Sequence, residues 1–556
     1  MTGPTRGSSD VGRARTDRYD SAMTAPDLAA AASVIDLASK VVDAGIRTLA
    51  ATEGGIDVHQ VLAYDLAHAA SAIATAKGLL DYGAKGDAEG KITCAFVADA
   101  VADLAAKVFG REGEFGVKAD ALDGAREFIG TYKAASFLAS ITDPGPRHLD
   151  GDFEMVQDTF RRYAEQELAP RAEHIHRSNG DIPEDIISGL AEMGAFGLSI
   201  PAEYGGYGEG GEGEYIGMVV TTEELSRGSL GAGGSLITRP EILTRALIAG
   251  GTEEQKLEWL PKLATAEVMN AVAVTEPDYG SDVAGVKVTA TPTEGGWLIN
   301  GVKTWCTFGA RADVLLVLAR TDPDRTKGHR GLSMFIVPKD RGDSHGFELV
   351  QRAEGGAAGG GKMEGRPIDT IGYRGMHSYE IALEDWFVPA ANLIGLEDGM
   401  GKGFYYQMAG FENGRLQTAA RAIGVMQAAY EKARTYAEDR VVFGSPIGDY
   451  QLTKAKLGRM AVIIQASRQF SYEVSKLMAK GEGQAEASMV KAYVCKAAEW
   501  VTREAMQIHG GMGYAEEYDV SRYFVDARVL SIFEGADEVL CLKVIARKLI
   551  ADLQTA

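Results

Sequence analysis

The chain has 556 residues and a mass of 59.2 kDa, with 46% hydrophobic and 24% charged residues. This composition is typical of a globular protein of several domains and excludes a disordered or collagen-like chain. The formal charge of −21 at pH 7 argues against nucleic acid as a partner, because a phosphate backbone repels so acidic a protein. The sequence contains no run of about 18 uncharged apolar residues, so we expect no membrane span.

The N-terminus and the cysteines indicate the compartment. Residues 1–25 are polar and lack an apolar segment, so we interpret them as a flexible tail rather than a signal peptide. The four cysteines are Cys94, Cys306, Cys495 and Cys541. Their wide spacing and the absence of a Cys-x-x-Cys pair suit a reducing compartment. We therefore expect a cytoplasmic protein.

The hydrophobic pattern divides the rest of the chain into four segments. Residues 26–146 are alanine-rich with apolar residues three and four apart, which predicts a helical extension ending at Asp143-Pro144-Gly145-Pro146. Helical patterns continue over 147–269, the N-terminal α domain of the core. Residues 270–398 alternate between apolar and polar, which predicts a domain of half-buried antiparallel strands. Helical periodicity resumes over 399–556, the C-terminal α domain.

These segments predict an α+β fold class. A central antiparallel β-sandwich or barrel lies between an N-terminal helical domain and a C-terminal helical bundle, and an extra helical extension precedes them. The strands are expected near residues 286–293, 296–305, 313–321, 331–340 and 379–389.

Two glycine motifs match nucleotide-binding patterns by letter only. Gly208-x-Gly210-x-x-Gly213 contains two glutamates and has no βαβ unit around it, as a dinucleotide site requires. The run from Gly356 to Lys362 imitates a Walker A loop, but Met363 replaces the Ser or Thr that would hold Mg²⁺. A P-loop-like nucleotide-binding protein is therefore a distant alternative. The histidines form no metal-binding pattern, so we expect no metal.

Six other motifs occur together in a fixed order. They span residues 273–282, 299–307, 384–389, 440–444, 507–511 and 533–535. In this order they resemble the acyl-CoA dehydrogenase family of flavoproteins, and the resemblance covers about residues 151–556. It implies FAD as cofactor and an acyl-CoA as substrate, which loses an α-proton to a base and a β-hydride to the flavin.

The resemblance assigns the chemistry to a short segment near the C-terminus. Glu534 stands where many family members have the catalytic base. The α C–H bond is a weak acid, so a positioned carboxylate must take its proton. Backbone at Glu534-Gly535, together with a flavin hydroxyl, would meet the charge that develops on the thioester oxygen. Ser281 matches the loop that touches the flavin ribityl chain and CoA, and Arg415 matches a position that contacts CoA or the end near the thioester. The chain departs from the family at Ala536, where Thr or Ser is common, so one flavin contact is lost or replaced there.

The resemblance also assigns two sets of residues to FAD. Those expected at the flavin of their own chain are Thr275, Ser281, Trp305 and Thr307. Those expected to reach the FAD of a neighbouring subunit are Arg440, Phe443, Gln451, Gln507 and Gly511. The alternation around Trp305 is equally typical of a strand between core and solvent. A shared FAD site implies an obligate oligomer, and we expect a homodimer because the extension can occupy the surface where a second dimer would dock.

The extension and the stretch 360–378 point to a narrower substrate class. They most resemble members that convert (2S)-methylsuccinyl-CoA to mesaconyl-CoA, with electron-transferring flavoprotein as acceptor. The second carboxylate of that substrate needs a buried cation, and we expect Arg239, with Arg245, Arg374 and His377 as rivals and plain surface charges as the other interpretation. The alternatives are a dehydrogenase or oxidase of another short acyl-CoA, and a non-catalytic scaffold.

Overall fold

The computed structural model describes residues 24–343, 345–353 and 359–555. The predicted flexible tail lies almost wholly outside these residues, as does part of the motif from Gly356 to Lys362. Among the described residues, no helix is both long and apolar enough to cross a membrane. The four cysteines are buried and unpaired.

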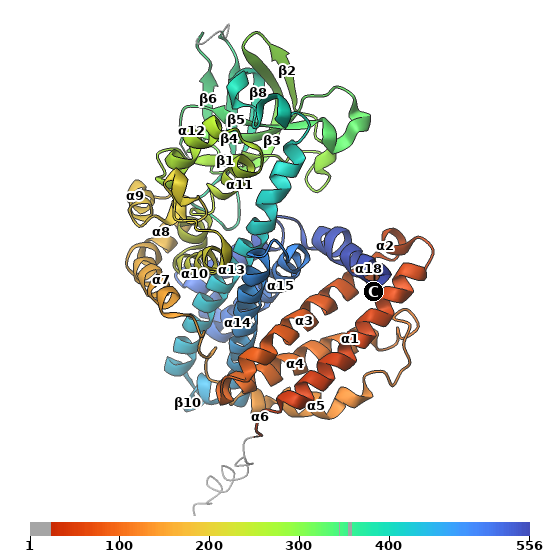
Figure 1. The fold of residues 1–556 in the computed structure, drawn as a ribbon. Coiled ribbons are helices and arrows are strands. Elements are labelled where there is room, and N and C mark those ends of the chain that lie inside the picture. The colour runs from red at the N-terminus through yellow and green to blue at the C-terminus, as the bar shows by residue number, and fades with distance from the viewer. Residues whose placement is uncertain (1–23, 344, 354–358, 556) are drawn as a thin grey trace, which may run out of the picture.

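The N-terminal extension is a layer of helices packed on one side of the core (Figure 1). Helix α1 begins after Asp27, whose carboxylate accepts a hydrogen bond from the amide of Ala30 (2.9 Å). Its apolar face packs on α3 and α4, which in turn pack against α14 and α15 of the C-terminal domain. The helices of the extension are α1 (Leu28–Ala51), α2 (Gly55–Val58), α3 (Gln60–Gly83), α4 (Asp87–Val108), α5 (Arg126–Tyr132) and α6 (Ala135–Leu138).

A second group of helices connects the extension to the sheet. They are α7 (Gly151–Tyr163), α8 (Ala169–Ser178), α9 (Glu184–Glu192), α10 (Gly211–Gly228), α11 (Glu241–Gly250) and α12 (Glu253–Ala264). Helix α10 begins at Gly211, inside the glycine motif 208–213, and no strand precedes it in the part of the chain that the structure describes. A dinucleotide fingerprint is therefore absent there, as predicted.

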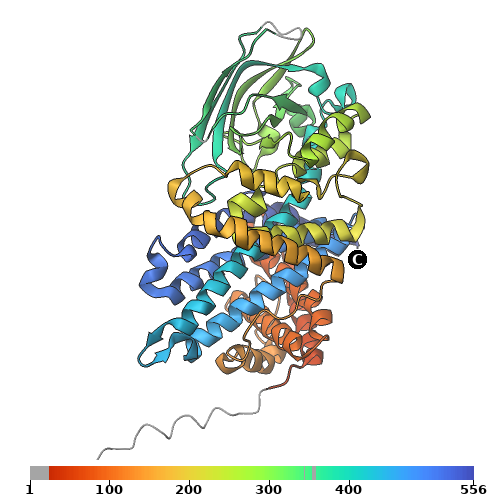
Figure 2. The same cartoon turned by 90° about the vertical axis from the view of Figure 1, so that its left-hand side faces the viewer.

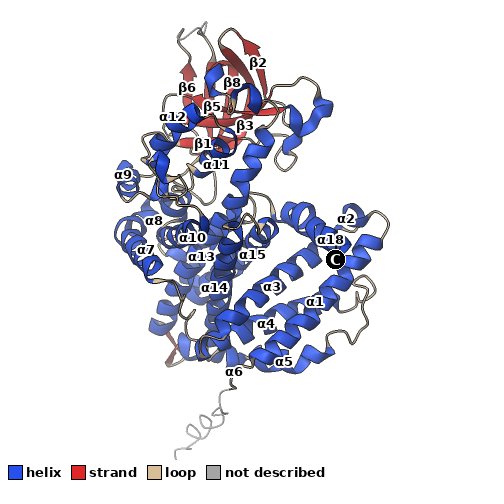
Figure 3. Ribbon diagram, viewed as in Figure 1, coloured by secondary structure: helices blue, strands red, loops and turns tan. Residues whose placement is uncertain are grey.

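The β domain is one eight-stranded sheet with the order β1-β4-β2-β3-β8-β7-β6, and β5 pairs with β4 (Figure 3). The strands are β1 (Asn270–Ala273), β2 (Thr289–Thr293), β3 (Gly296–Thr307), β4 (Val314–Arg320), β5 (Leu332–Pro338), β6 (Phe347–Val350), β7 (Lys362–Ile368) and β8 (Ser378–Pro389). The predicted α+β class is confirmed, but the sheet is mixed rather than purely antiparallel, because β1 pairs in parallel with β4. Strands β1, β6 and β7 were not among the expected strands; charged residues interrupt the apolar pattern of β6 and β7.

The C-terminal domain is built on α13, which runs for 37 residues, or about 55 Å, away from the sheet. A short hairpin of β9 (Val441–Val442) and β10 (Ser445–Pro446) lies at its far end (Figures 1 and 2). The turn residues Phe443 (φ 53°) and Gly444 (φ 88°) both have positive φ, as a tight hairpin turn requires. The other helices are α14 (Gln451–Met478), α15 (Gln484–His509), α16 (Asp519–Leu530), α17 (Asp537–Val539) and α18 (Ala546–Thr555).

Candidate active site

The predicted base Glu534 lies on a tight turn between α16 and α17. Glu534 and Gly535 both have left-handed backbone angles, with φ of 56° and 97°. A left-handed conformation of a residue other than glycine costs about 1–3 kcal/mol and persists only where the surroundings hold it. The left-handed backbone at Glu534 therefore carries an energetic cost that other contacts of the turn must offset.

The carboxylate of Glu534 faces α13. Its Oε2 atom is buried without a hydrogen-bond partner among the described residues. A Cβ added at Gly414 would lie 3.1 Å from that oxygen, so α13 leaves just enough room for the carboxylate. The other oxygen, Oε1, is 3.9 Å from Nη2 of Arg421. A buried carboxylate oxygen without a hydrogen-bond partner is suited to accept a proton from a bound substrate.

Two cations that the sequence did not single out hold this turn. Arg421 is fully buried, and its guanidinium lies over the ring of Phe533, 4.9 Å from the centroid. Lys491, also buried, donates a hydrogen bond to the carbonyl of Gly535 (2.6 Å). Both occur in alanine-containing helical runs, where a charge ordinarily points to solvent. The sequence therefore held no signal for either.

Arg415 lies on the same helix as Gly414 and Arg421. One of its terminal nitrogens donates to the hydroxyl of Ser488 (3.2 Å), and its Nε atom is buried without a partner among the described residues. Burial lowers the pKa of Arg415, and the carboxylates of Glu412 and Glu534 offset part of that effect. Its free donor is available to a ligand beside Glu534.

The flavin residues predicted for the same chain lie on and around β3. Thr275 and Thr304 are joined by a backbone hydrogen bond (2.8 Å), and the Thr307 hydroxyl lies 3.0 Å from that of Ser378. Trp305 sits at a register shift between β3 and β8, has a φ of 58°, and is 55% exposed. Such a bulge redirects a side chain, so the indole stands out from the sheet as a flat apolar wall. Ser281 is exposed on the loop between β1 and β2, which also carries Thr275.

A buried ion pair organises the loop that carries Thr275 and Ser281. Glu276 accepts hydrogen bonds from the Nζ of Lys303 (2.9 Å) and from the amides of Lys287 (2.7 Å) and Val288 (2.9 Å). Lys303 also donates to the carbonyl of Val274 (2.9 Å). The pair thus ties the loop to β3, just under the exposed indole.

The second set of predicted flavin residues lies at the opposite end of α13 from the β domain (Figure 1). Phe443 projects from the hairpin turn and is 96% exposed. His509 stacks on Tyr436 with ring centroids 4.3 Å apart, which brings the end of α15 beside the hairpin. The exposed residues of this group are Arg440, Phe443, Gln451, Gln507 and Gly511.

Arg239 is buried next to Arg421. Its Nε donates to the carbonyl of Ser235 (3.2 Å), while Nη1 of Arg421 contacts the hydroxyl of the same residue (3.4 Å). Among the described residues, the only carboxylate within 4.0 Å of either guanidinium is that of Glu534. Burial lowers the pKa of Arg421, and the nearby charge of Arg239 lowers it further. An anion bound between the two guanidinium groups would offset the repulsion between their charges.

The rival cations are engaged elsewhere. Arg245 forms ion pairs with Glu241 (2.8 Å) and Glu214 (2.7 Å). Arg374 donates to the carbonyls of Thr370 and His176, and His377 lies 3.3 Å from Asp181. These contacts leave Arg239 as the predicted cation with unused charge.

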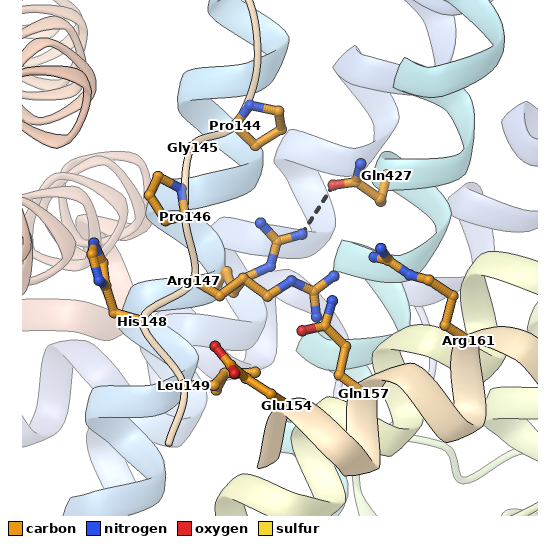
Figure 4. Close-up of a pocket in the computed structure, with 11 residues that line it drawn as sticks. Pro144, Gly145, Pro146, Arg147, His148, Leu149, Glu154, Gln157, Arg161 and Gln427 are labelled. Atoms are coloured by element: carbon orange, nitrogen blue, oxygen red, sulfur yellow. Dashed lines mark hydrogen bonds between the residues drawn. The ribbon is translucent and has the colours of Figure 1, made fainter. Parts of the chain in front are cut away.

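A cavity of about 420 Å³ lies elsewhere, where the segment after the extension meets the core (Figure 4). Arg147 enters it and forms ion pairs with two buried carboxylates, Glu223 (2.9 Å) and Glu224 (2.7 Å). None of the predicted site residues lines this cavity. Its buried charges fasten the segment after the extension to α10.

Residues 151–267, 271–386 and 401–550 match, in this order, the N-terminal, middle and C-terminal domains of acyl-CoA dehydrogenases. The chain belongs to the acyl-CoA dehydrogenase family. It is 43% identical to the (2S)-methylsuccinyl-CoA dehydrogenase of Cereibacter sphaeroides over 73% of this chain and 71% of that one. It is 34% identical to an acyl-CoA dehydrogenase of Bacillus subtilis over 70% and 96% of the two chains.

The likeness extends to solved structures. A glutaryl-CoA dehydrogenase of Mycobacterium smegmatis in complex with FADH2 superimposes with a TM-score of 0.62 at 25% identity, over 72% of this chain and 95% of that one. The protein is thus an FAD-dependent oxidoreductase, as predicted from the motifs. The residues present suit a flavin, because the exposed indole of Trp305 offers a stacking face beside the hydroxyl of Thr307.

Proposed function

We propose that the protein dehydrogenates (2S)-methylsuccinyl-CoA to mesaconyl-CoA. The observation that carries this proposal is the pair of buried guanidinium groups, Arg239 and Arg421, beside Glu534 and without a closer carboxylate partner among the described residues. A buried charge without a partner is costly, so a site that keeps two cations is suited to a substrate with its own carboxylate. The 43% identity to a (2S)-methylsuccinyl-CoA dehydrogenase supports the same substrate.

In the proposed reaction, Glu534 takes the α-proton of the thioester on its unpartnered Oε2 atom. The amide of the Glu534-Gly535 turn faces the thioester oxygen, and Arg415 and Ser281 bind the CoA end. Lys491 fixes the turn through the carbonyl of Gly535. When bound, FAD supplies the acceptor for the hydride that leaves the β-carbon.

We further propose that two chains share each FAD. Thr275, Trp305 and Thr307 of one chain cover the flavin, and the exposed group from Arg440 to Gly511 reaches it from the partner. An aromatic side chain as exposed as Phe443 is suited to burial in such an interface. A homodimer, with electron-transferring flavoprotein as acceptor, is the simplest assembly that meets these demands.

The alternatives predict different flavin behaviour. An enzyme for another short acyl-CoA would reduce its flavin with uncharged branched substrates at least as fast as with methylsuccinyl-CoA. A non-catalytic scaffold or a P-loop-like nucleotide-binding protein would show no reduction at all.

The proposal is tested by anaerobic stopped-flow of the FAD-loaded protein with methylsuccinyl-CoA, 2-methylbutyryl-CoA and isovaleryl-CoA, following flavin absorbance near 450 nm. We expect methylsuccinyl-CoA to bleach the flavin fastest. In parallel, Glu534→Gln should bind acyl-CoA and keep FAD but reduce the flavin at least about 10²-fold more slowly. Near-normal reduction by this variant would refute the assigned base, and Glu412, beside Arg415, would be examined next.

A further inference from the structure

The helical extension reaches the turn that carries Glu534. Asp537 lies three residues after Glu534, begins α17, and is 6% exposed. Its Oδ2 atom accepts a short hydrogen bond from the hydroxyl of Tyr64 and lies 3.1 Å from Nε2 of His68. Tyr64 and His68 occupy successive turns of α3, more than 460 residues earlier in the chain. One carboxylate thus connects the extension directly to the catalytic segment.

A third group completes this contact. Lys496 of α15 donates to the Tyr64 hydroxyl (2.7 Å) and lies 3.6 Å from the same Asp537 oxygen. Burial alone would raise the pKa of Asp537, but His68, Tyr64 and Lys496 together hold it below its usual range. Burial and the neighbouring carboxylate raise the pKa of Tyr64. Its hydroxyl therefore stays protonated and donates a hydrogen bond to Asp537.

The position of this contact matters because the turn is strained. Glu534 has a φ of 56°, and Lys491 holds the carbonyl of Gly535 from the core side. Asp537 anchors the other end, both through its side chain and through its amide, which donates to the carbonyl of Ser531 (3.1 Å). A strained turn persists only where it is held on both sides. Releasing Asp537 would let the turn relax and move the Glu534 carboxylate.

We propose that Tyr64 and His68 are positioning residues for catalysis: through Asp537, the extension holds the turn that aims Glu534 at the substrate. Asp537, the acceptor that the extension binds, directly follows Ala536, where the chain departs from the family. This inference rests on the proposed role of Glu534.

The same groups offer an alternative that the structure disfavours. His68, Asp537 and Cys541 present ligand atoms within 4.8 Å of one another, which is close enough for a metal ion. The ammonium of Lys496 beside Asp537 opposes a second cation there. Burial also raises the pKa of the Cys541 thiol, so the thiolate that a metal needs is disfavoured.

The test uses the full-length FAD-loaded protein and the double variant Tyr64→Phe/His68→Leu. We expect flavin reduction by methylsuccinyl-CoA to slow about tenfold, with the dissociation constant of the acyl-CoA and the FAD content unchanged within twofold. His68→Gln keeps a donor toward Asp537 and should retain most of the rate. A purely structural role would not separate the reduction rate from binding in this way.

The matched control is Asp99→Asn, which weakens a different fastening between extension and core. Asp99 on α4 binds Arg459 of α14 (2.7 Å) and Lys133, far along the chain from the catalytic turn. Asp99→Asn should lower thermal stability but leave the reduction rate unchanged. An equal slowing in both variants, or no slowing in the double variant, would overturn the proposal.

Two further outcomes are distinguishable. If Glu534→Gln reduces its flavin normally, the base assignment fails, whatever the double variant does. If a chelator slows the untreated protein and Zn²⁺ restores it, the cluster is a metal site and the positioning role is wrong. We expect the chelator to have no effect.

Discussion

Replacing Arg239 by methionine should weaken turnover of methylsuccinyl-CoA much more than turnover of an uncharged analogue. Arg239 is 9% exposed and shares Ser235 with the fully buried Arg421. No carboxylate lies within 4.0 Å of Arg239 among the described residues, so its charge is available to the distal carboxylate of the proposed substrate, methylsuccinyl-CoA. Methionine keeps most of the volume and removes only the charge and the donors.

The expected magnitude follows from the type of bond that is lost. A hydrogen bond to a charged group contributes about 1.5–3 kcal/mol, which corresponds to roughly 10- to 100-fold in rate or affinity. We therefore expect the ratio of kcat/KM for methylsuccinyl-CoA to that for 2-methylbutyryl-CoA to fall roughly 10- to 100-fold. The uncharged substrate has no group that pairs with Arg239, so its own kcat/KM should change little.

The control is Arg374→Met, because Arg374 was a rival for the same role and is bonded to the carbonyls of Thr370 and His176. This variant should leave the selectivity ratio within about twofold of the unmodified protein. Steady-state assays with an artificial electron acceptor measure both ratios. Equal losses on both substrates in Arg239→Met, or a selectivity change only in Arg374→Met, would refute the assignment of Arg239.

Three other predictions concern assembly, the flavin and pH. Light scattering should give a molar mass of about twice 59.2 kDa, and a flavin-loaded monomer would contradict the shared site. In heterodimers of a Glu534→Gln chain with a Phe443→Ala chain, one of the two active sites should regain activity. Trp305→Ala should weaken FAD retention on gel filtration while leaving far-UV circular dichroism unchanged; full retention would remove the indole from the site. Burial lowers the pKa of His176 from 6.5 to about 4. The contribution of neutral His176 to the free energy of unfolding is therefore complete above pH 6.5 and is lost as the pH falls toward 4. Urea denaturation should show a loss of up to about 3 kcal/mol over that range, smaller in His176→Phe and unchanged in the exposed control His174→Gln.

The order of the fold could be predicted because it follows from local periodicity. Apolar residues three and four apart predicted the helices of the extension, and alternation predicted β3, β4, β5 and β8. The parallel pairing of β1 with β4 could not be predicted, since it joins strands separated by the β2–β3 hairpin. Strand order is a property of the packed sheet, whereas periodicity describes only one strand at a time.

The candidate site divides in the same way. The motifs predicted roles for Glu534 and Trp305, because a family motif is a local string of residues, whereas Arg239 was predicted from the charge of the substrate's second carboxylate. The exposure of Trp305 was left open by its alternation, and the register shift between β3 and β8 decided it. The exposed group around Phe443 was predicted from motifs, and the structure places it at the end of α13 that lies away from the β domain.

The charges around Glu534 were decided by tertiary structure alone. Arg421 and Lys491 occur in helical runs in which a cation ordinarily faces solvent, yet the packing of α13, α15 and the catalytic turn buries both. Tyr64 and His68 lie at the other end of the sequence and meet Asp537 only because α3 packs against the C-terminal domain. The sequence by itself showed which candidate residues are present and the order in which they occur along the chain. Which charges are buried together depended on contacts between distant segments, because burial is set by packing and not by neighbours along the chain.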